Sequence, residues 1–132
     1  MLSLTIHGAP RTKKNSSRFI VAGGRRRIIP SKAHEQWFRG AMQELLLLRA
    51  QAVQGGASLP LDCPVCVKAT FYRDRNSGDL LNYEQALADA LEASWIIEDD
   101  KLIVSWDGSR LEVDASRPRI EVEIVRYERR AS

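Results

Sequence analysis

The chain has 132 residues, of which 44% are hydrophobic and 28% charged, and its formal net charge is +3. This length suits a single domain spanning residues 1–132, and the composition excludes a disordered chain. The first residues lack the basic segment and apolar run of a signal peptide, and no stretch reaches the roughly 20 apolar residues that cross a bilayer. We therefore expect a folded cytoplasmic protein that does not associate with membranes.

The N-terminal half predicts a strand, a hairpin and a helix, in this order. Residues 2–7 alternate apolar and polar side chains, at the period of a half-buried strand. Residues 18–29, RFIVAGGRRRII, predict a hairpin, because the two central glycines tolerate the positive φ angles of a tight turn. Ser31 is the expected N-cap of a helix that ends by Gly55. One stripe of this helix carries residues expected to pack on a sheet: Ala33, Trp37, Ala41, Leu45, Leu48 and Ala52.

The C-terminal half predicts a strand, a second helix and two further strands. Residues 63–73 alternate at period two, with Val65, Val67, Ala69 and Phe71 on one face. The second helix spans about residues 79–94, and its core stripe consists of Leu80, Tyr83, Leu87 and Leu91. Residues 101–111 and 119–128 are the predicted strands that follow. This order indicates an α+β fold in which two main helices pack on a mixed β-sheet.

Acidic residues occur where the second helix begins and where it leads into the next strand. Asp79 lies at the helix start, and Glu98, Asp99 and Asp100 are consecutive. Clustered carboxylates repel one another unless a hard divalent cation neutralises them, and Mg²⁺ suits such a site, with Mn²⁺ as an alternative. Such an ion supports phosphodiester hydrolysis. The plain alternatives are that Asp79 caps the helix and that the acidic run is a polar turn.

Basic residues are clustered in loops and in the hairpin, where long side chains can reach phosphates. Contacts of this kind give affinity for DNA that does not depend on its sequence. The alternative is a solvated basic surface. The candidate DNA-binding residues are Lys13, Lys14, Arg25, Arg26, Arg27, Arg73 and Arg75.

Residues 78–110, GDLLNYEQALADALEASWIIEDDKLIVSWDGSR, resemble the RusA-type Holliday junction resolvases. That family carries Asp-x-Asp-Asn at a helix start, a lysine one turn along, Asp-Ala-Leu later in the helix, and an Asp-Asp pair that enters a strand. The resemblance covers residues 64–124. The matching residues in this chain are Asp79, Asn82, Asp89, Ala90, Leu91, Asp99 and Asp100.

The resemblance implies a RusA-like fold and a homodimeric endonuclease that nicks four-way DNA junctions with Mg²⁺. It implies catalytic roles for Asp79, Asp99 and Asp100, with Asn82 as a supporting polar residue, and metal binding by Asp79 and Asp100. Two-fold symmetry suits a four-way junction, which needs paired cuts. The adjacent Leu46 and Leu47 widen the apolar stripe of the first helix, which indicates either a subunit interface or a broad core face.

Two positions depart from the family pattern. Leu81 stands where the second catalytic aspartate belongs, and Gln85 stands where the lysine belongs. Either a substitute carboxylate completes the site or activity is weakened. The candidate substitutes are Asp74, Glu84 and Asp89, of which Glu84 is turned about 140° around the helix from Asp79 and Asp89 lies ~15 Å along it.

The departures leave two alternative functions open. One is a dimer that binds branched DNA but cuts it poorly or not at all. The other is a structural or interaction protein in which the acidic run is only a turn.

Overall fold

The computed structural model describes residues 2–13, 17–30 and 32–128, with the two strands of the hairpin described by their backbone alone. Ten elements follow one another along the chain. They are β1 (Leu2–His7), β2 (Ser17–Ala22), β3 (Arg25–Pro30), α1 (Lys32–Gln54), β4 (Val65–Arg73), α2 (Leu80–Ala93), the 3₁₀ helix η1 (Asp100–Leu102), β5 (Ile103–Ser105), β6 (Arg110–Val113) and β7 (Arg119–Arg126).

A five-stranded mixed sheet forms the centre of the molecule. β7 lies between β1 and β4 and is antiparallel to both. On its other side, β4 pairs in parallel with β5 near its start and with β6 near its end. The prediction of an α+β fold with a mixed sheet and two main helices is confirmed.

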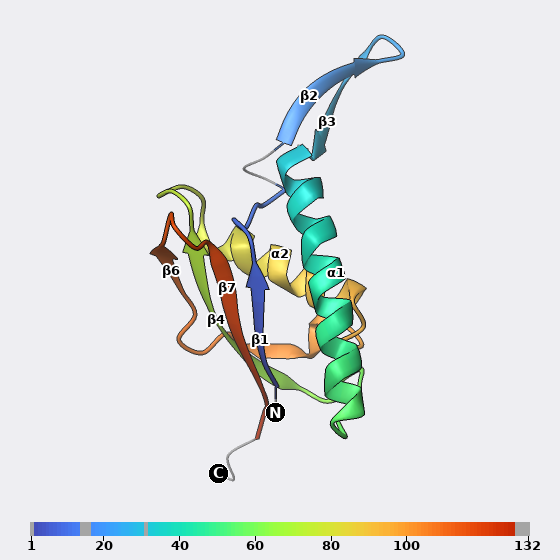
Figure 1. Cartoon of the computed structure of the whole chain (residues 1–132). Coiled ribbons are helices and arrows are strands. Elements are labelled where there is room, and N and C mark those ends of the chain that lie inside the picture. Colours follow the sequence, from blue (N-terminus) through green and yellow to red (C-terminus); the bar gives the residue numbers. More distant parts are fainter. Residues whose placement is uncertain (1, 14–16, 31, 129–132) are drawn as a thin grey trace.

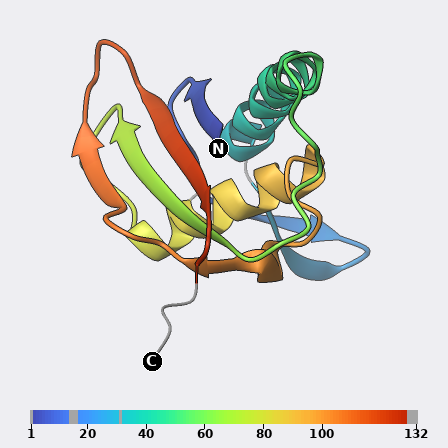
Figure 2. The same cartoon turned by 90° about the horizontal axis from the view of Figure 1, so that it is seen from below.

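The core lies between this sheet and the two helices, which cover one of its faces (Figures 1 and 2). The alternation predicted for β4 is confirmed, because its inward side chains are fully buried. On β7, Ile120, Val122 and Ile124 point into the core while Glu121 and Glu123 face outward. The stripe predicted for α2 is also confirmed, with Leu87 and Leu91 fully buried. Neither helix in the described ranges is long and apolar enough to span a membrane.

Two details of the predicted elements were wrong. The single strand expected over residues 101–111 is two short strands, β5 and β6, because a turn at Asp107–Gly108 interrupts it and Gly108 has a φ of 70°. On α1, His34 is buried whereas Ala33 is exposed, so the buried stripe starts one residue later than expected. The rest of the buried stripe, Trp37, Ala41 and Leu45, matches the prediction.

β2 and β3 form a separate two-stranded sheet that projects beyond the start of α1 (Figure 1). The predicted hairpin is confirmed. Gly23 and Gly24 have φ angles of 59° and 75°, as a primed turn requires. The expected cap Ser31 lies outside the described residues, and α1 ends at Gln54, as predicted.

Candidate active site

The path of the chain around α2 decides which acidic residues can meet. α2 joins two parallel strands, and β5 begins opposite Val65, the first residue of β4. The acidic turn that precedes β5 therefore lies beside the start of β4, whereas Asp79 follows its end. About 20 Å of helix rise separates Asp79 from Glu92 near the other end of α2. Asp79 and Glu92 thus lie near opposite ends of α2.

Three carboxylates do come together at the end of α2. Glu92, Asp99 and Asp100 each offer an oxygen, and these oxygens lie within 4.8 Å of one another. The Asp100 backbone N–H donates to Glu92 Oε1 at 3.0 Å. The Lys101 N–H donates to Asp99 Oδ1 at 2.8 Å, which makes Asp99 the cap of η1. We call Glu92, Asp99 and Asp100 the acidic cluster.

Sequence reasoning missed Glu92, although one signal was present. Glu92 lies in the last turn of α2, where the negative end of the helix dipole disfavours a carboxylate. An acidic residue at that end of a helix is better tolerated when a cation is near. Its position therefore indicates the same kind of site as the two aspartates that follow it.

The turn that carries the acidic cluster is held by its aliphatic neighbours. Trp95 adopts a left-handed conformation, with a φ of 63°, and reverses the chain after α2. The Ile96 N–H donates to the Leu91 carbonyl at 3.1 Å, and the Ile96 side chain is buried. The Glu98 N–H donates to the Leu61 carbonyl at 2.9 Å, which joins the turn to the segment before β4. Glu98 itself points to solvent.

The electrostatics of the acidic cluster favour a bound cation. Burial raises the pKa of Asp100, and the neighbouring charges of Glu92 and Asp99 raise that pKa further. No salt bridge among the described residues involves these three carboxylates. A set of oxygen ligands with uncompensated negative charge fits a hard divalent ion such as Mg²⁺ or Mn²⁺.

A cavity of about 350 Å³ lies between α2 and the η1–β5 segment. Its lining residues are Leu81, Glu84, Gln85, Ala88, Asp100, Ile103 and Trp106. Asp100 thus belongs to the acidic cluster and to this cavity. The two positions that depart from the family pattern, Leu81 and Gln85, line the same cavity, which we call the α2–β5 cavity.

Asn82 lies on a different side of α2. It lines a small cavity of about 100 Å³ together with Lys13, Gln85 and Asp89. The Asp89 carboxylate accepts a hydrogen bond from Gln85 Nε2 at 2.8 Å and lies 3.9 Å from Lys13 Nζ. The structure therefore brings Asn82 close to a predicted DNA-binding lysine rather than to Asp100.

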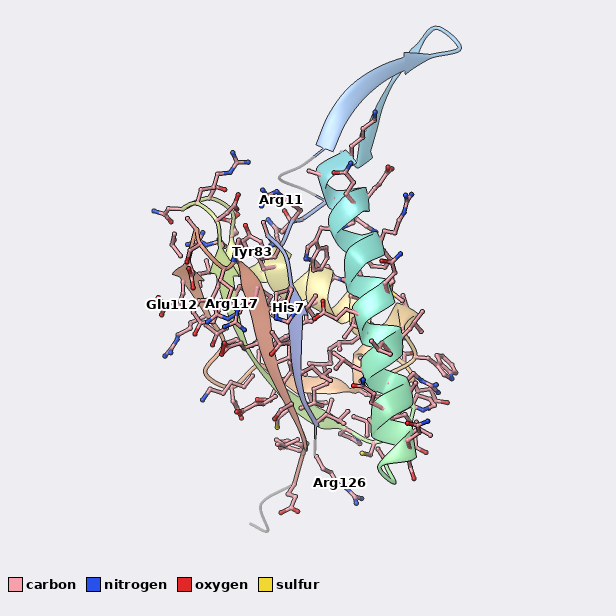
Figure 3. All side chains as sticks on the ribbon, in the orientation of Figure 1. His7, Arg11, Tyr83, Glu112, Arg117 and Arg126 are labelled. Carbon is pink, nitrogen blue, oxygen red and sulfur yellow. The ribbon has the colours of Figure 1, made fainter. Side chains whose placement is uncertain are left out.

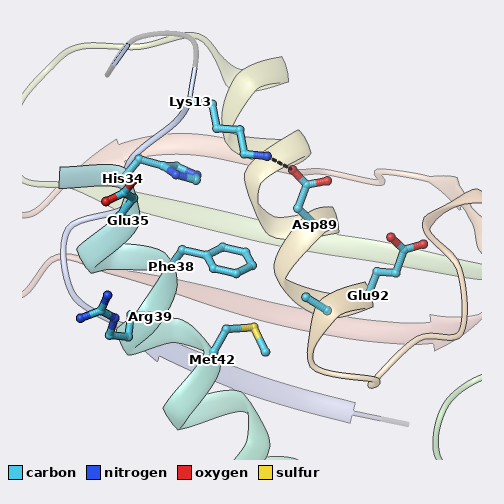
Figure 4. A pocket seen from close by; sticks show the side chains of 9 residues that line it. Lys13, His34, Glu35, Phe38, Arg39, Met42, Asp89 and Glu92 are labelled. Carbon is cyan, nitrogen blue, oxygen red and sulfur yellow. Dashed lines mark ion pairs between the residues drawn. The ribbon is translucent and has the colours of Figure 1, made fainter. Parts of the chain in front are cut away.

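A further cavity, of about 650 Å³, opens between α1 and α2 (Figure 4). Phe38, Met42 and the Lys13–Asp89 pair line it, and Glu92 connects it to the acidic cluster. His34 lies at its upper end, where burial and the Lys13 charge lower the pKa of its imidazole.

The predicted DNA-binding residues fall into three groups. Lys13 and Arg75 are exposed. Arg73 is buried, and its guanidinium donates to the Ser77 carbonyl at 2.9 Å and to Asn76 Oδ1 at 3.1 Å, so it organises its own loop and does not suit the expected phosphate contact. Lys14 and the side chains of Arg25, Arg26 and Arg27 lie outside the described part of the chain.

An ion pair that sequence reasoning missed fixes the loop before α2. Arg11 donates to both carboxylate oxygens of Asp74, each at 2.9 Å. The Tyr83 hydroxyl donates to the Ser77 carbonyl at 2.9 Å, and Figure 3 shows Arg11 and Tyr83 at the same end of the sheet. The Arg11 guanidinium holds the pKa of Asp74 below its usual value. This pair attaches the N-terminal loop to the start of α2.

Replacing Asp74 by asparagine is expected to lower the free energy of unfolding at neutral pH by about 1–2 kcal/mol, because two charge-assisted hydrogen bonds are lost. The lowered pKa means that this stabilisation is present above the usual aspartate pKa and is lost as the pH falls through the folded-state value. Urea unfolding at neutral and acidic pH measures the difference. Glu112→Gln, which breaks an exposed pair with Arg110, is the matched control and should change little. An equal loss at both pH values would contradict this account.

Comparison with models of known protein families identifies the family of this chain. The family model described as Endodeoxyribonuclease RusA matches residues 8–125, nearly the whole chain. A search of curated proteins found no match. The match includes β4, α2, the acidic cluster and the α2–β5 cavity, which are the parts that carry the candidate site. The chain therefore belongs to the RusA endodeoxyribonuclease family.

Proposed function

We propose that the protein is a metal-dependent endodeoxyribonuclease that nicks four-way DNA junctions, with its active site at the acidic cluster and the α2–β5 cavity. The observation that carries the proposal is the position of Asp100. One of its carboxylate oxygens lies within 4.8 Å of oxygens from two further carboxylates, and Asp100 also lines the cavity that contains Leu81 and Gln85, the two positions that depart from the family pattern. Family membership supports nuclease activity in general.

Asp100 and Glu92 are the residues proposed to hold the ion, and Asp99 caps η1, which begins at Asp100. A bound Mg²⁺ or Mn²⁺ would polarise the phosphodiester and lower the pKa of a water molecule. The protein groups would have to orient the DNA backbone. Lys13 and Arg75 are exposed, and their long side chains can contact DNA phosphates.

Asp79 and Asn82 remain proposed site residues because of the family resemblance. Asp79 is exposed at the N-cap of α2, and its side chain makes no capping hydrogen bond. Asp79 precedes Leu81, which lines the α2–β5 cavity, by two residues. We propose that Asp79 contacts either the DNA or the metal ion held at the active site.

A homodimer is also part of the proposal, because a junction resolved by paired nicks needs two active sites. Leu46 and Leu47 on α1 are 52% and 60% exposed, and this apolar pair fits a subunit interface. Light scattering on the purified protein measures the molar mass. A monomer at the concentrations that support cleavage would contradict the dimer.

The second candidate function is a protein that binds branched DNA without cutting it. Leu81 and Gln85 favour it, because neither can replace an acidic ligand or a cation. A labelled synthetic four-way junction, incubated with Mg²⁺ or with EDTA, decides between the two. Paired nicks that require metal support the nuclease, whereas a stable shifted complex without product supports the binding protein. No complex at low salt would contradict both.

Arg75→Gln is expected to weaken junction binding and to reduce the slope of log affinity against log salt by about 1, as the loss of one phosphate contact predicts. Arg75 is exposed in the loop before α2. Arg126→Gln, an exposed arginine at the end of β7 (Figure 3), is the charge-matched control and should leave the slope unchanged. Equal effects of the two substitutions would show that only net charge matters.

A further inference from the structure

We propose that Glu84 is a further acidic group that, together with Asp100, holds a divalent cation in the α2–β5 cavity, in the place of the aspartate that Leu81 replaces. This inference rests on the proposed nuclease function. It extends that function by naming a residue that the family pattern does not include. Three observations carry it: the other candidate carboxylates are engaged elsewhere, Glu84 has no partner among the described residues, and it lines the same cavity as Asp100.

Asp74 and Asp89 are both excluded as substitutes by their contacts. Asp74 is held by two hydrogen bonds from Arg11 in the loop before α2. Asp89 accepts a hydrogen bond from Gln85 and faces Lys13 in the small cavity on the other side of α2. Neither residue lines the α2–β5 cavity. Of the three substitutes considered from the sequence, only Glu84 does.

Glu84 is a buried carboxylate with an unusual environment. It is 7% exposed, and its side chain makes no hydrogen bond or ion pair within the described part of the chain. Burial alone raises the pKa of its carboxyl group. Its carboxylate oxygens are not among the fully enclosed side-chain atoms that lack a partner, so they stay accessible, and Glu84 lines the cavity. A poorly solvated carboxylate without a partner is costly, and such groups concentrate at functional sites. The position of Glu84 therefore does not stabilise the fold, which indicates a functional role for this residue.

The position of Glu84 on α2 fits the missing ligand. Residues three apart on a helix are neighbours on its surface, so Glu84 lies one turn from Leu81. Its side chain is one methylene longer than that of aspartate and can extend into the cavity. The cavity wall opposite α2 contains Asp100 and Trp106, from η1 and from the segment after β5. The cavity thus has one carboxylate from each of its two sides.

Metal binding tests the proposal without requiring cleavage. We expect calorimetry with Mn²⁺ to show that Glu84→Gln lowers the affinity of the full chain about 10-fold or more, as loss of a metal-holding group does. Glu98→Gln is the matched control, because Glu98 is an exposed carboxylate in the same acidic turn, and it should bind Mn²⁺ like the wild type. The double variant E84Q/L81D should recover most of the lost affinity, because it returns a carboxylate to the cavity.

Terbium luminescence locates the ion. Trp106 lines the cavity, so excitation of tryptophan should sensitise bound Tb³⁺, and Trp106→Phe should remove most of that emission while calorimetric Mn²⁺ affinity is unchanged. Emission that survives Trp106→Phe would mean that Trp37 or Trp95, neither of which lines the cavity, sensitises the ion, and it would overturn the proposal. Thermal melting of the metal-free variants shows that they are folded. Glu84→Gln should melt no lower than the wild type, because it removes an unpaired buried charge.

The outcomes separate this proposal from the proposed function. If the wild type nicks junctions and the Glu84→Gln variant binds Mn²⁺ as tightly as the wild type, the role of Glu84 alone is overturned. Wild-type protein that binds no Mn²⁺ and cuts no junction would overturn both. A 10-fold or larger loss of affinity in Glu84→Gln, with recovery in E84Q/L81D, would support the role of Glu84 even if cleavage were slow.

Discussion

Asp100→Asn should abolish metal-dependent nicking of four-way junctions, with a loss on the order of 100-fold or more, and should leave junction binding intact. The reason is that Asp100 is the carboxylate shared by the acidic cluster and the α2–β5 cavity. Removing a group that binds the metal costs at least as much as the 10–100-fold typical of residues that support such ligands. Cleavage of a labelled junction with Mg²⁺, compared with gel retention in EDTA, measures the two effects separately.

The same substitution has an opposite effect on stability. Because the pKa of Asp100 is raised in the folded protein, its charged form opposes folding at neutral pH. Metal-free Asp100→Asn protein should therefore melt at the same temperature as the wild type or somewhat higher near neutral pH. This advantage should vanish below the usual aspartate pKa, where Asp100 is protonated in both states. A large drop in melting temperature would mean that lost activity reflects lost structure.

A matched control for Asp100→Asn is Asp107→Asn. Asp107 is an exposed aspartate in the turn after β5 and does not line the cavity. The Asp107→Asn variant should cut junctions at the wild-type rate. Equal losses of cleavage rate in both variants would contradict a specific role of Asp100 in catalysis. They would favour the alternative that the protein only binds DNA.

Leu81→Asp should increase metal affinity and the nicking rate, each about 10-fold or more, because it restores an acidic ligand to the cavity. The substitution should be tolerated by the fold. Leu81 is 78% exposed, so little apolar burial is lost, and a carboxylate in the first turn of a helix interacts favourably with the helix dipole. The nicking rate at several Mg²⁺ concentrations distinguishes tighter metal binding from faster chemistry.

Leu81→Asn is the control for this gain. Asparagine has nearly the shape of aspartate but carries no charge, so it should leave the nicking rate close to that of the wild type. If aspartate and asparagine behave alike, the absent ligand at this position does not limit the reaction. Glu84→Gln should lower metal affinity less in the Leu81→Asp protein than in the wild type. The double variant still offers one carboxylate from α2 to the ion.

Much of the fold could be predicted because burial leaves a regular trace in the chain. The inward side chains of β4 and β7 recur at every second position, and those of α2 at every third or fourth, as the geometry of strands and helices requires. The hairpin followed from two glycines that accept positive φ angles. The break between β5 and β6 was missed, although Asp107 and Gly108 form a common turn pair.

The candidate site was harder to predict, because it depends on contacts between distant segments. The Asp99–Asp100 pair was visible in the chain, and the structure adds Glu92 from the end of α2. A shared metal site for Asp79 and Asp100 stays a prediction, whereas α2 carries the chain back to the start of β4 and brings Glu92 at its end to the two aspartates. Arg73 was expected at the surface, but loop carbonyls take its guanidinium.

By itself, the sequence determined the elements, their buried faces and the family, because these follow from local periodicity and from motifs with defined spacing. Only the tertiary structure decided which carboxylates share a cavity. On an isolated helix, the side chains of Glu84 and Asp79 point in directions about 140° apart, which makes a shared ion unfavourable. The relevant partner of Glu84 is Asp100. The packing of η1 and β5 against α2 places Glu84 and Asp100 on the walls of one cavity. Such proximity depends on how elements pack, which spacing along the chain does not encode.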